Sequence, residues 1–219
     1  MFYYSYAKDK SRVQIFGDKF ELDNLYRIIH KIAKPLADND KLNGQYQLFL
    51  YFAFEIDKAA SGKRNKDISK YEVQGKIRKN TYYGTSFCWI DLIIIINIIR
   101  KYSSFSLLDR RTQAYLYSLE SAIENAIINF DEKGDLVAKY VFNIGIDVSG
   151  KYLLAIAQYI SNKFSDKKNK IMFSYIPDLL HYYLCEFSEG NKAICKLIEE
   201  EAKSRGIKPD YFEFKYQYE

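Results

Sequence analysis

The longest apolar run in the chain covers residues 87–99 and constrains the fold more than any other feature of the sequence. The run has 13 residues and contains Asp91 and Asn97, whereas a membrane-spanning helix needs about 20 mostly apolar residues. Four consecutive isoleucines favour a strand, but the length favours a helix, and we predict a buried helix over residues 90–102. Asp91 is expected to cap this helix, the alternative being a carboxyl group that is buried in the core and has a raised pKa.

Apolar patterns with a period near 3.6 predict helices along most of the remaining chain. Residues 18–35 begin with Asp18 and Glu21 at the positions of a capping box and end at Pro35. Residues 42–60 are apolar on nearly every side, so this helix is expected to be central and well buried. The other predicted helices cover residues 109–130, 136–144, 151–164, 177–188 and 191–205.

Both ends of the chain alternate with the period of two that is typical of strands. Residues 2–7 and 12–15 predict a hairpin with a turn at 8–11. At the other end, polar residues alternate with Phe212, Phe214, Tyr216 and Tyr218. Because a half-buried strand needs neighbours, we expect the two ends to share a sheet. The predicted fold class is α+β, a helix-dominated single domain with a small antiparallel sheet formed by the N-terminal hairpin and the C-terminal strand.

Positive charge is concentrated in one segment of this chain of 219 residues. Residues 62–80 hold seven basic and two acidic residues, whereas the rest of the chain holds 26 of each. Length and globular composition predict a single globular domain over residues 1–219, with residues 62–80 as a loop or hairpin insertion. Within and after this segment, a short hairpin at 71–78 and a strand at 81–85 are expected.

The basic segment has two interpretations. We favour a solvated, lysine-rich connection, because the sequence shows no helix-turn-helix and no RNA-binding signature. The alternative is weak, salt-sensitive nucleic-acid binding, in which cations contact phosphates and nearby tyrosines stack on bases. The candidate contact residues are Lys63, Arg64, Lys66, Lys76, Arg78 and Lys79.

A second polar cluster has the residue types of a cysteine enzyme. Asp178, His181 and Cys185 are spaced three and four residues apart, so a helix places them on one face. A cysteine nucleophile needs a nearby base, and the base needs an acid that orients it. Here His181 would be the base and Asp178 the orienting acid. Polar residues on an outer helix face also fall into this spacing by chance, and we favour that interpretation. Zinc, nucleotide-phosphate and serine-hydrolase motifs are missing, so no metal and no cofactor is predicted.

Aromatic residues make up 17% of the chain, nearly all of them Tyr or Phe. Most of those on helix stripes or alternating strands are expected to be buried. Tyrosine is favoured at interfaces, because it combines a large contact area with a polar tip. Besides Tyr3, the tyrosines without an expected core role, and therefore the candidate interface residues, are Tyr71, Tyr82, Tyr83 and Tyr182.

Several short strings resemble a bacterial single-domain family of unknown function. They are Ile15-Phe16-Gly17-Asp18, Leu22-x-x-Leu25-Tyr26-x-x-Ile29-His30, Tyr83-Gly84-x-x-Phe87-x-Trp89, the apolar helix that ends in Arg100, and Leu119-Glu120-x-x-Ile123-Glu124. The resemblance covers roughly residues 1–130. It implies a single intact domain of bacterial type and carries no activity with it.

These observations lead us to expect a non-enzymatic intracellular binding or regulatory protein that acts on a protein partner or associates with itself. Three cysteines without paired spacing argue against a secreted disulfide scaffold, and no signal peptide is recognisable. A cytoplasmic protein without a membrane partner is therefore expected. The alternatives are weak nucleic-acid binding through residues 62–80 and an enzyme with a Cys–His pair on helix 177–188.

Overall fold

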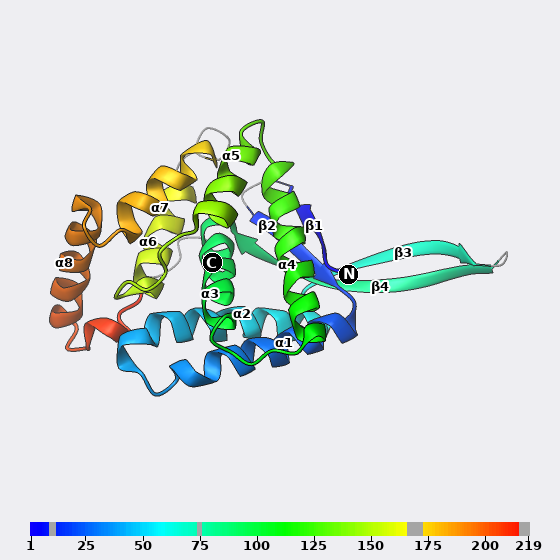
Figure 1. The fold of residues 1–219 in the computed structure, drawn as a ribbon, viewed down its shortest axis with the longest axis horizontal. Helices are drawn as coiled ribbons and strands as arrows, with labels where there is room; N and C mark the ends of the chain where they lie inside the picture. The colour runs from blue at the N-terminus through cyan, green and yellow to red at the C-terminus, as the bar shows by residue number, and fades with distance from the viewer. Residues whose placement is uncertain (9–11, 74–75, 166–172, 215–219) are drawn as a thin grey trace.

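The computed structural model describes residues 1–8, 12–73, 76–165 and 173–214, except for the side chains of residues 70–78 and 165. The described part is a helix-dominated α+β fold with eight α-helices and one four-stranded antiparallel sheet, which confirms the predicted class (Figure 1). The helices are α1 Lys19–Ala33, α2 Asn43–Ala60, α3 Trp89–Ser103, α4 Arg110–Ile128, α5 Gly134–Lys139, α6 Leu153–Ser165, α7 Ile176–Leu184 and α8 Glu189–Ser204. The strands are β1 Tyr3–Tyr6, β2 Arg12–Gly17, β3 Asn65–Val73 and β4 Lys76–Cys88. Short helical turns cover Lys34–Leu36, Asp40–Leu42, Tyr140–Ile144, Phe173–Tyr175 and Pro209–Tyr211.

Helix α3 forms the centre of the core, as predicted from its apolar run. Every residue from Trp89 to Ile99 is buried. A helix that is apolar all round must be packed on every side, and α1, α2 and α6 lie against it (Figure 1). Among the helices of the described residues, none has both the length and the apolar character needed to cross a membrane.

The start of α1 follows the predicted capping box. The Asp18 side chain accepts the backbone N–H of Glu21 at 2.8 Å, and the Glu21 carboxylate accepts the backbone N–H of Asp18 at 2.9 Å. These two bonds satisfy amides that the first turn of a helix leaves without an intrahelical acceptor. The hairpin of β1 and β2 just before it is also confirmed.

The sheet has the order β1-β2-β4-β3, so the N-terminal hairpin pairs with the segment from Asn65 to Cys88. The predicted C-terminal strand was wrong where the structure describes it, since Phe212 and Phe214 lie in no strand; residues 215–219 lie outside the described residues. Phe212 is 2% exposed and its ring lies 4.8 Å from the guanidinium carbon of Arg205, just after α8. The alternating pattern correctly indicated that these aromatic rings pack against the core. They pack against helices, however, and not within a sheet.

Three predicted helix ends also need correction. Cys88 and not Asp91 is the N-cap of α3, and Asp91 lies in the first turn with 1% exposure, which confirms the burial of this carboxyl group. The predicted helix 136–144 divides into α5 and a π-helical turn from Tyr140 to Ile144. Helix α7 ends at Leu184, before the expected end at 188.

Candidate functional site

A groove of about 1470 Å³ runs along one side of α2. Its walls come from α1, α2, α6, the beginning of β3, the end of β4 and the C-terminal segment. At one end α2 is tied to this segment, because the Asn43 side chain donates to the carbonyl oxygen of Asp210. Pockets for small molecules usually hold about 300–1,000 Å³, so this groove has room for a chain segment.

The α2 wall carries a partly exposed stripe. Gln47, Leu50, Tyr51 and Phe54 line the groove with the spacing of one helix face. Phe54 is 55% exposed, and the Lys58 ammonium lies 3.8 Å from the centre of its ring. The sequence of α2 predicts a helix that is well buried, but one apolar face of it lines the groove.

The part of the groove lined by β4 contains a strand edge. Strand β3 pairs with β4 only as far as the Asn65–Gly84 position, whereas β2 continues alongside β4 to Cys88. In the described part of the chain, residues 85–87 therefore have a strand on one side only. Thr85 and Ser86, which point to opposite faces of β4, both line the groove, so the groove reaches this edge.

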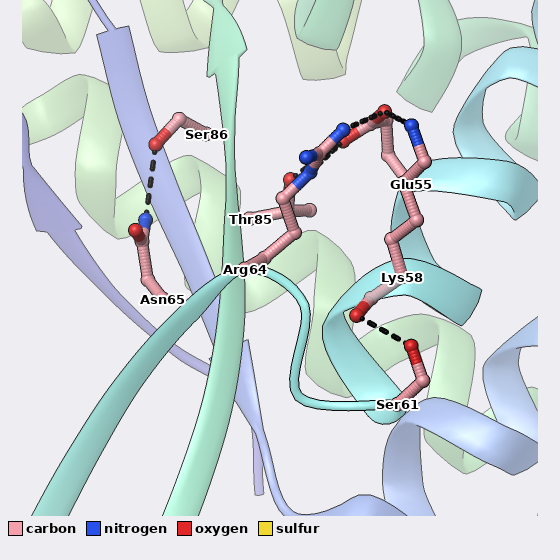
Figure 2. Close-up of polar contacts among 7 residues, drawn as sticks. All are labelled: Glu55, Lys58, Ser61, Arg64, Asn65, Thr85 and Ser86. Carbon is pink, nitrogen blue, oxygen red and sulfur yellow. Dashed lines mark hydrogen bonds and ion pairs between the residues drawn. The ribbon is translucent and has the colours of Figure 1, made fainter.

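An ion pair fixes the beginning of β3 to α2 beside this edge (Figure 2). Arg64 Nε and Nη2 donate to the two carboxylate oxygens of Glu55, each at 2.8 Å, and the Thr85 hydroxyl donates to Oε2 at 3.1 Å. Burial by itself would raise the pKa of Glu55, but the hydrogen bonds from Arg64 and Thr85 and the charges of Arg64 and Lys58 hold it below its ordinary value. Glu55 is thus a charged, well-satisfied anchor.

The floor of the groove holds a second carboxyl group. The Ser161 hydroxyl donates to Asp91 Oδ1 at 2.6 Å, which joins α6 to the first turn of α3. Burial raises the pKa of the nearby Tyr51 hydroxyl well above its ordinary value, and the negative charges of Asp91 and Glu55 add to this effect. Tyr51 therefore stays a neutral phenol.

The chain's own C-terminal segment closes the far end of the groove. The backbone N–H of Phe214 donates to Gln158 Oε1 on α6 at 2.8 Å, and the Phe214 ring packs 5.6 Å from that of Tyr159. Glu213 and Phe214 line the groove. A side chain of the groove thus already holds the backbone of a non-helical segment.

One family model matches the sequence over residues 8–219, and its description is a domain of unknown function, DUF6904. The chain belongs to this family. The expected membership of a family of unknown function is confirmed, and the match extends well beyond the first 130 residues. No curated protein and no solved structure matches the chain.

The predicted catalytic candidates lie outside the groove of this DUF6904 member. Asp178 and His181 are exposed on α7, and Cys185 is half-buried at its C-cap. In the described residues, no hydrogen bond or ion pair joins the three side chains. Likewise, no group of three His, Cys, Asp or Glu side chains among those residues is placed to hold a metal ion.

The basic candidates lie on or beside the hairpin of β3 and β4. Lys63, Lys66 and Lys79 are exposed, whereas the Arg64 guanidinium is held by Glu55. Lys76 and Arg78 belong to β4, but their side chains lie outside the described residues.

The candidate interface tyrosines whose side chains are described lie on different elements, Tyr82 and Tyr83 on β4 and Tyr182 on α7. Tyr82 lies edge-on to Tyr3 with ring centres 5.1 Å apart, and Tyr83 packs against the core. Tyr182, on α7, is 47% exposed. The Tyr71 side chain lies outside the described residues.

Sequence reasoning missed Glu55, the groove-lining carboxylate that joins α2 to Arg64 and Thr85. A usable signal was present, because Glu55 stands between Phe54 and Ile56 in a helix that is otherwise nearly all apolar. A carboxylate in such a position needs a partner. That partner, Arg64, was assigned to the basic segment instead.

Proposed function

We propose that this protein is a non-enzymatic binding protein of the bacterial cytoplasm, and that its groove takes an extended segment of a partner protein. The main chain of that segment would run along the edge of β4 at residues 85–87. Its large apolar side chains would pack against Leu50 and Phe54 of α2. The observation that carries the proposal is the presence, in one groove, of a strand edge without a strand neighbour among the described residues and a partly exposed apolar helix face.

Addition of a strand to a sheet edge is a common mode of peptide recognition. Main-chain hydrogen bonds supply affinity, and pockets for alternate side chains supply specificity. At the other end of the same groove, residues 212–214 read Phe-Glu-Phe and are held through both a backbone bond to Gln158 and aromatic packing. This supports a partner segment in which large apolar residues alternate with polar ones.

A selection from a displayed octapeptide library tests the proposal. Enriched peptides are synthesised with a fluorescent label, and their affinity is measured by anisotropy. We expect alternating apolar sequences whose binding weakens at least about tenfold, or 1.4 kcal/mol, in Leu50→Lys and Phe54→Lys variants. Phe187→Lys is the matched control, because Phe187 is 79% exposed and does not line the groove.

Main-chain pairing is tested separately with peptides that are N-methylated at alternate residues. One of the two methylation patterns blocks the amides that face β4 and should abolish binding, whereas the other should be tolerated. Equal binding of both methylated forms, or equal binding to the Phe54→Lys and Phe187→Lys variants, would show that this groove is not the site.

A further inference from the structure

The hairpin of β3 and β4 extends from the body as a two-stranded arm (Figure 1). The last pair that β2 makes with β4 is Gly17 with Tyr83, whereas β3 and β4 remain paired as far as Val73 and Lys76. At a rise of about 3.3 Å per residue, the free part of the ladder is about 23 Å long. A lone two-stranded ribbon is only marginally stable in water. A binding partner that contacts both strands would therefore stabilise this arm.

The arm carries the net positive charge of the chain. Residues 62–80 hold seven basic and two acidic residues, and the remainder of the sequence is balanced. Two of these nine charged side chains have partners within the protein, close to where the arm leaves the body. Arg64 pairs with Glu55, and Asp67 accepts a hydrogen bond from the Tyr3 hydroxyl at 2.8 Å. The charges that remain are Lys63, five basic residues along the arm, and Glu72.

The register of the arm places like charges together. Lys70 lies directly opposite Lys79 in the ladder. Like charges at such positions destabilise a hairpin, and a polyanion that bridges them removes this cost. Lysines along a strand edge also oppose pairing with another strand, which argues against a second copy as the occupant of the arm.

We propose that the arm binds double-stranded DNA by lying in its major groove. The major groove is about 12 Å wide and admits a two-stranded ribbon. The corresponding groove of double-stranded RNA is deep and narrow, so the ribbon fits DNA better. Binding rests on phosphate contacts and is not specific for sequence. The site is separate from the peptide groove, and either can exist without the other.

A shortened arm provides the first test. Deletion of residues 70–73 and 76–79 removes Lys70, Lys76, Arg78 and Lys79, and it makes Ser69 and Asn80 the closing pair. Four residues are lost from each strand, so the alternation of faces is retained. A second variant, Lys70→Gln with Lys79→Gln, keeps the full hairpin and removes the opposed charges. The matched control is Lys192→Gln with Lys203→Gln, two exposed lysines of α8, which lies at the opposite side of the molecule from the arm (Figure 1).

Anisotropy of a labelled duplex of about 20 base pairs is measured over a series of salt concentrations, starting from about 50 mM. The wild type should bind with micromolar affinity at low salt, and the shortened arm should weaken binding at least about tenfold. The slope of log K against log salt should fall by about 3 to 4, because each lost phosphate contact removes about 0.9. The double glutamine variant should lose part of the affinity while its melting temperature is unchanged or higher.

Three results would overturn the proposal. They are no binding of the duplex at low salt, an equal loss in the α8 control, and binding to double-stranded RNA of the same length that is as tight as to DNA. If the shortened chain does not fold, the comparison of the two double glutamine variants decides the matter. A Phe54→Lys variant should bind the duplex like the wild type, so failure of the peptide proposal leaves this test intact.

Discussion

Arg64 and Glu55 form a bidentate ion pair, with both nitrogen–oxygen distances at 2.8 Å, and this pair joins the root of the arm to the wall of the groove. Arg64→Lys keeps the charge but offers a single ammonium in place of the planar fork. We expect the free energy of unfolding to fall by about 1–2 kcal/mol, since Arg64 is partly exposed. Urea denaturation measures this, with Arg27→Lys on the exposed face of α1 as a control that should stay within about 0.5 kcal/mol. Equal stability of the two variants would contradict an anchoring role for the pair.

The same pair predicts how stability depends on pH. The pKa of Glu55 is lower in the folded chain than its ordinary value of 4.5, so the folded state favours the charged form. This contribution is fully present above the ordinary pKa and is lost as the pH falls through the lower, folded value. The stability difference between the wild type and Glu55→Gln should therefore be largest near neutral pH and shrink below about pH 4.5. Urea titrations of both proteins across this pH range measure the stability difference. A difference that grows on acidification would contradict the prediction.

The sequence predicted correctly those elements that are determined by residues close together in the chain. The capping box of Asp18 and Glu21 needs only residues three apart, and the apolar run of α3 can be buried only in the middle of a helical core. The aromatic alternation at Phe212 and Phe214 showed which rings pack against the core but could not show whether a sheet or helices cover them.

The groove was not predictable for a related reason. It depends on where β3 stops beside β4, and this register is a long-range property of the chain. The pairing of Glu55 with Arg64 is close in sequence, but each residue already had a local explanation, one as part of a helix and the other as part of a basic run. Only the packing of α2 against β4 shows that they meet.

Gly84 is required where the three strands β2, β4 and β3 meet. A Cβ atom at this position would lie 2.5 Å from Cδ1 of the Phe16 ring and 2.8 Å from the Ile15 carbonyl oxygen. Gly84→Ala should therefore lower the free energy of unfolding by about 1–3 kcal/mol, as is usual for overpacking. In contrast, a Cβ at Gly150 would have its nearest neighbour at 3.9 Å. Thermal and urea unfolding should find Gly150→Ala within about 0.5 kcal/mol of the wild type, and equal effects at the two glycines would contradict the close approach.

The three cysteines should differ in reactivity in an order set by burial. Cys88 is 8% exposed, and burial together with the nearby charge of Glu199 raises the pKa of Cys195. Since the thiolate is the reactive form, iodoacetamide should modify Cys185 first, Cys195 more slowly and Cys88 last, as followed by mass spectrometry of the peptides.

Cys185 itself should react no faster than a model thiol, because its side chain makes no hydrogen bond to His181 in the described structure. His181→Ala should accordingly leave its rate unchanged. A Cys185 that reacts much faster than a model thiol, and loses this advantage in the His181→Ala variant, would instead support the cysteine–histidine enzyme that the sequence spacing suggested.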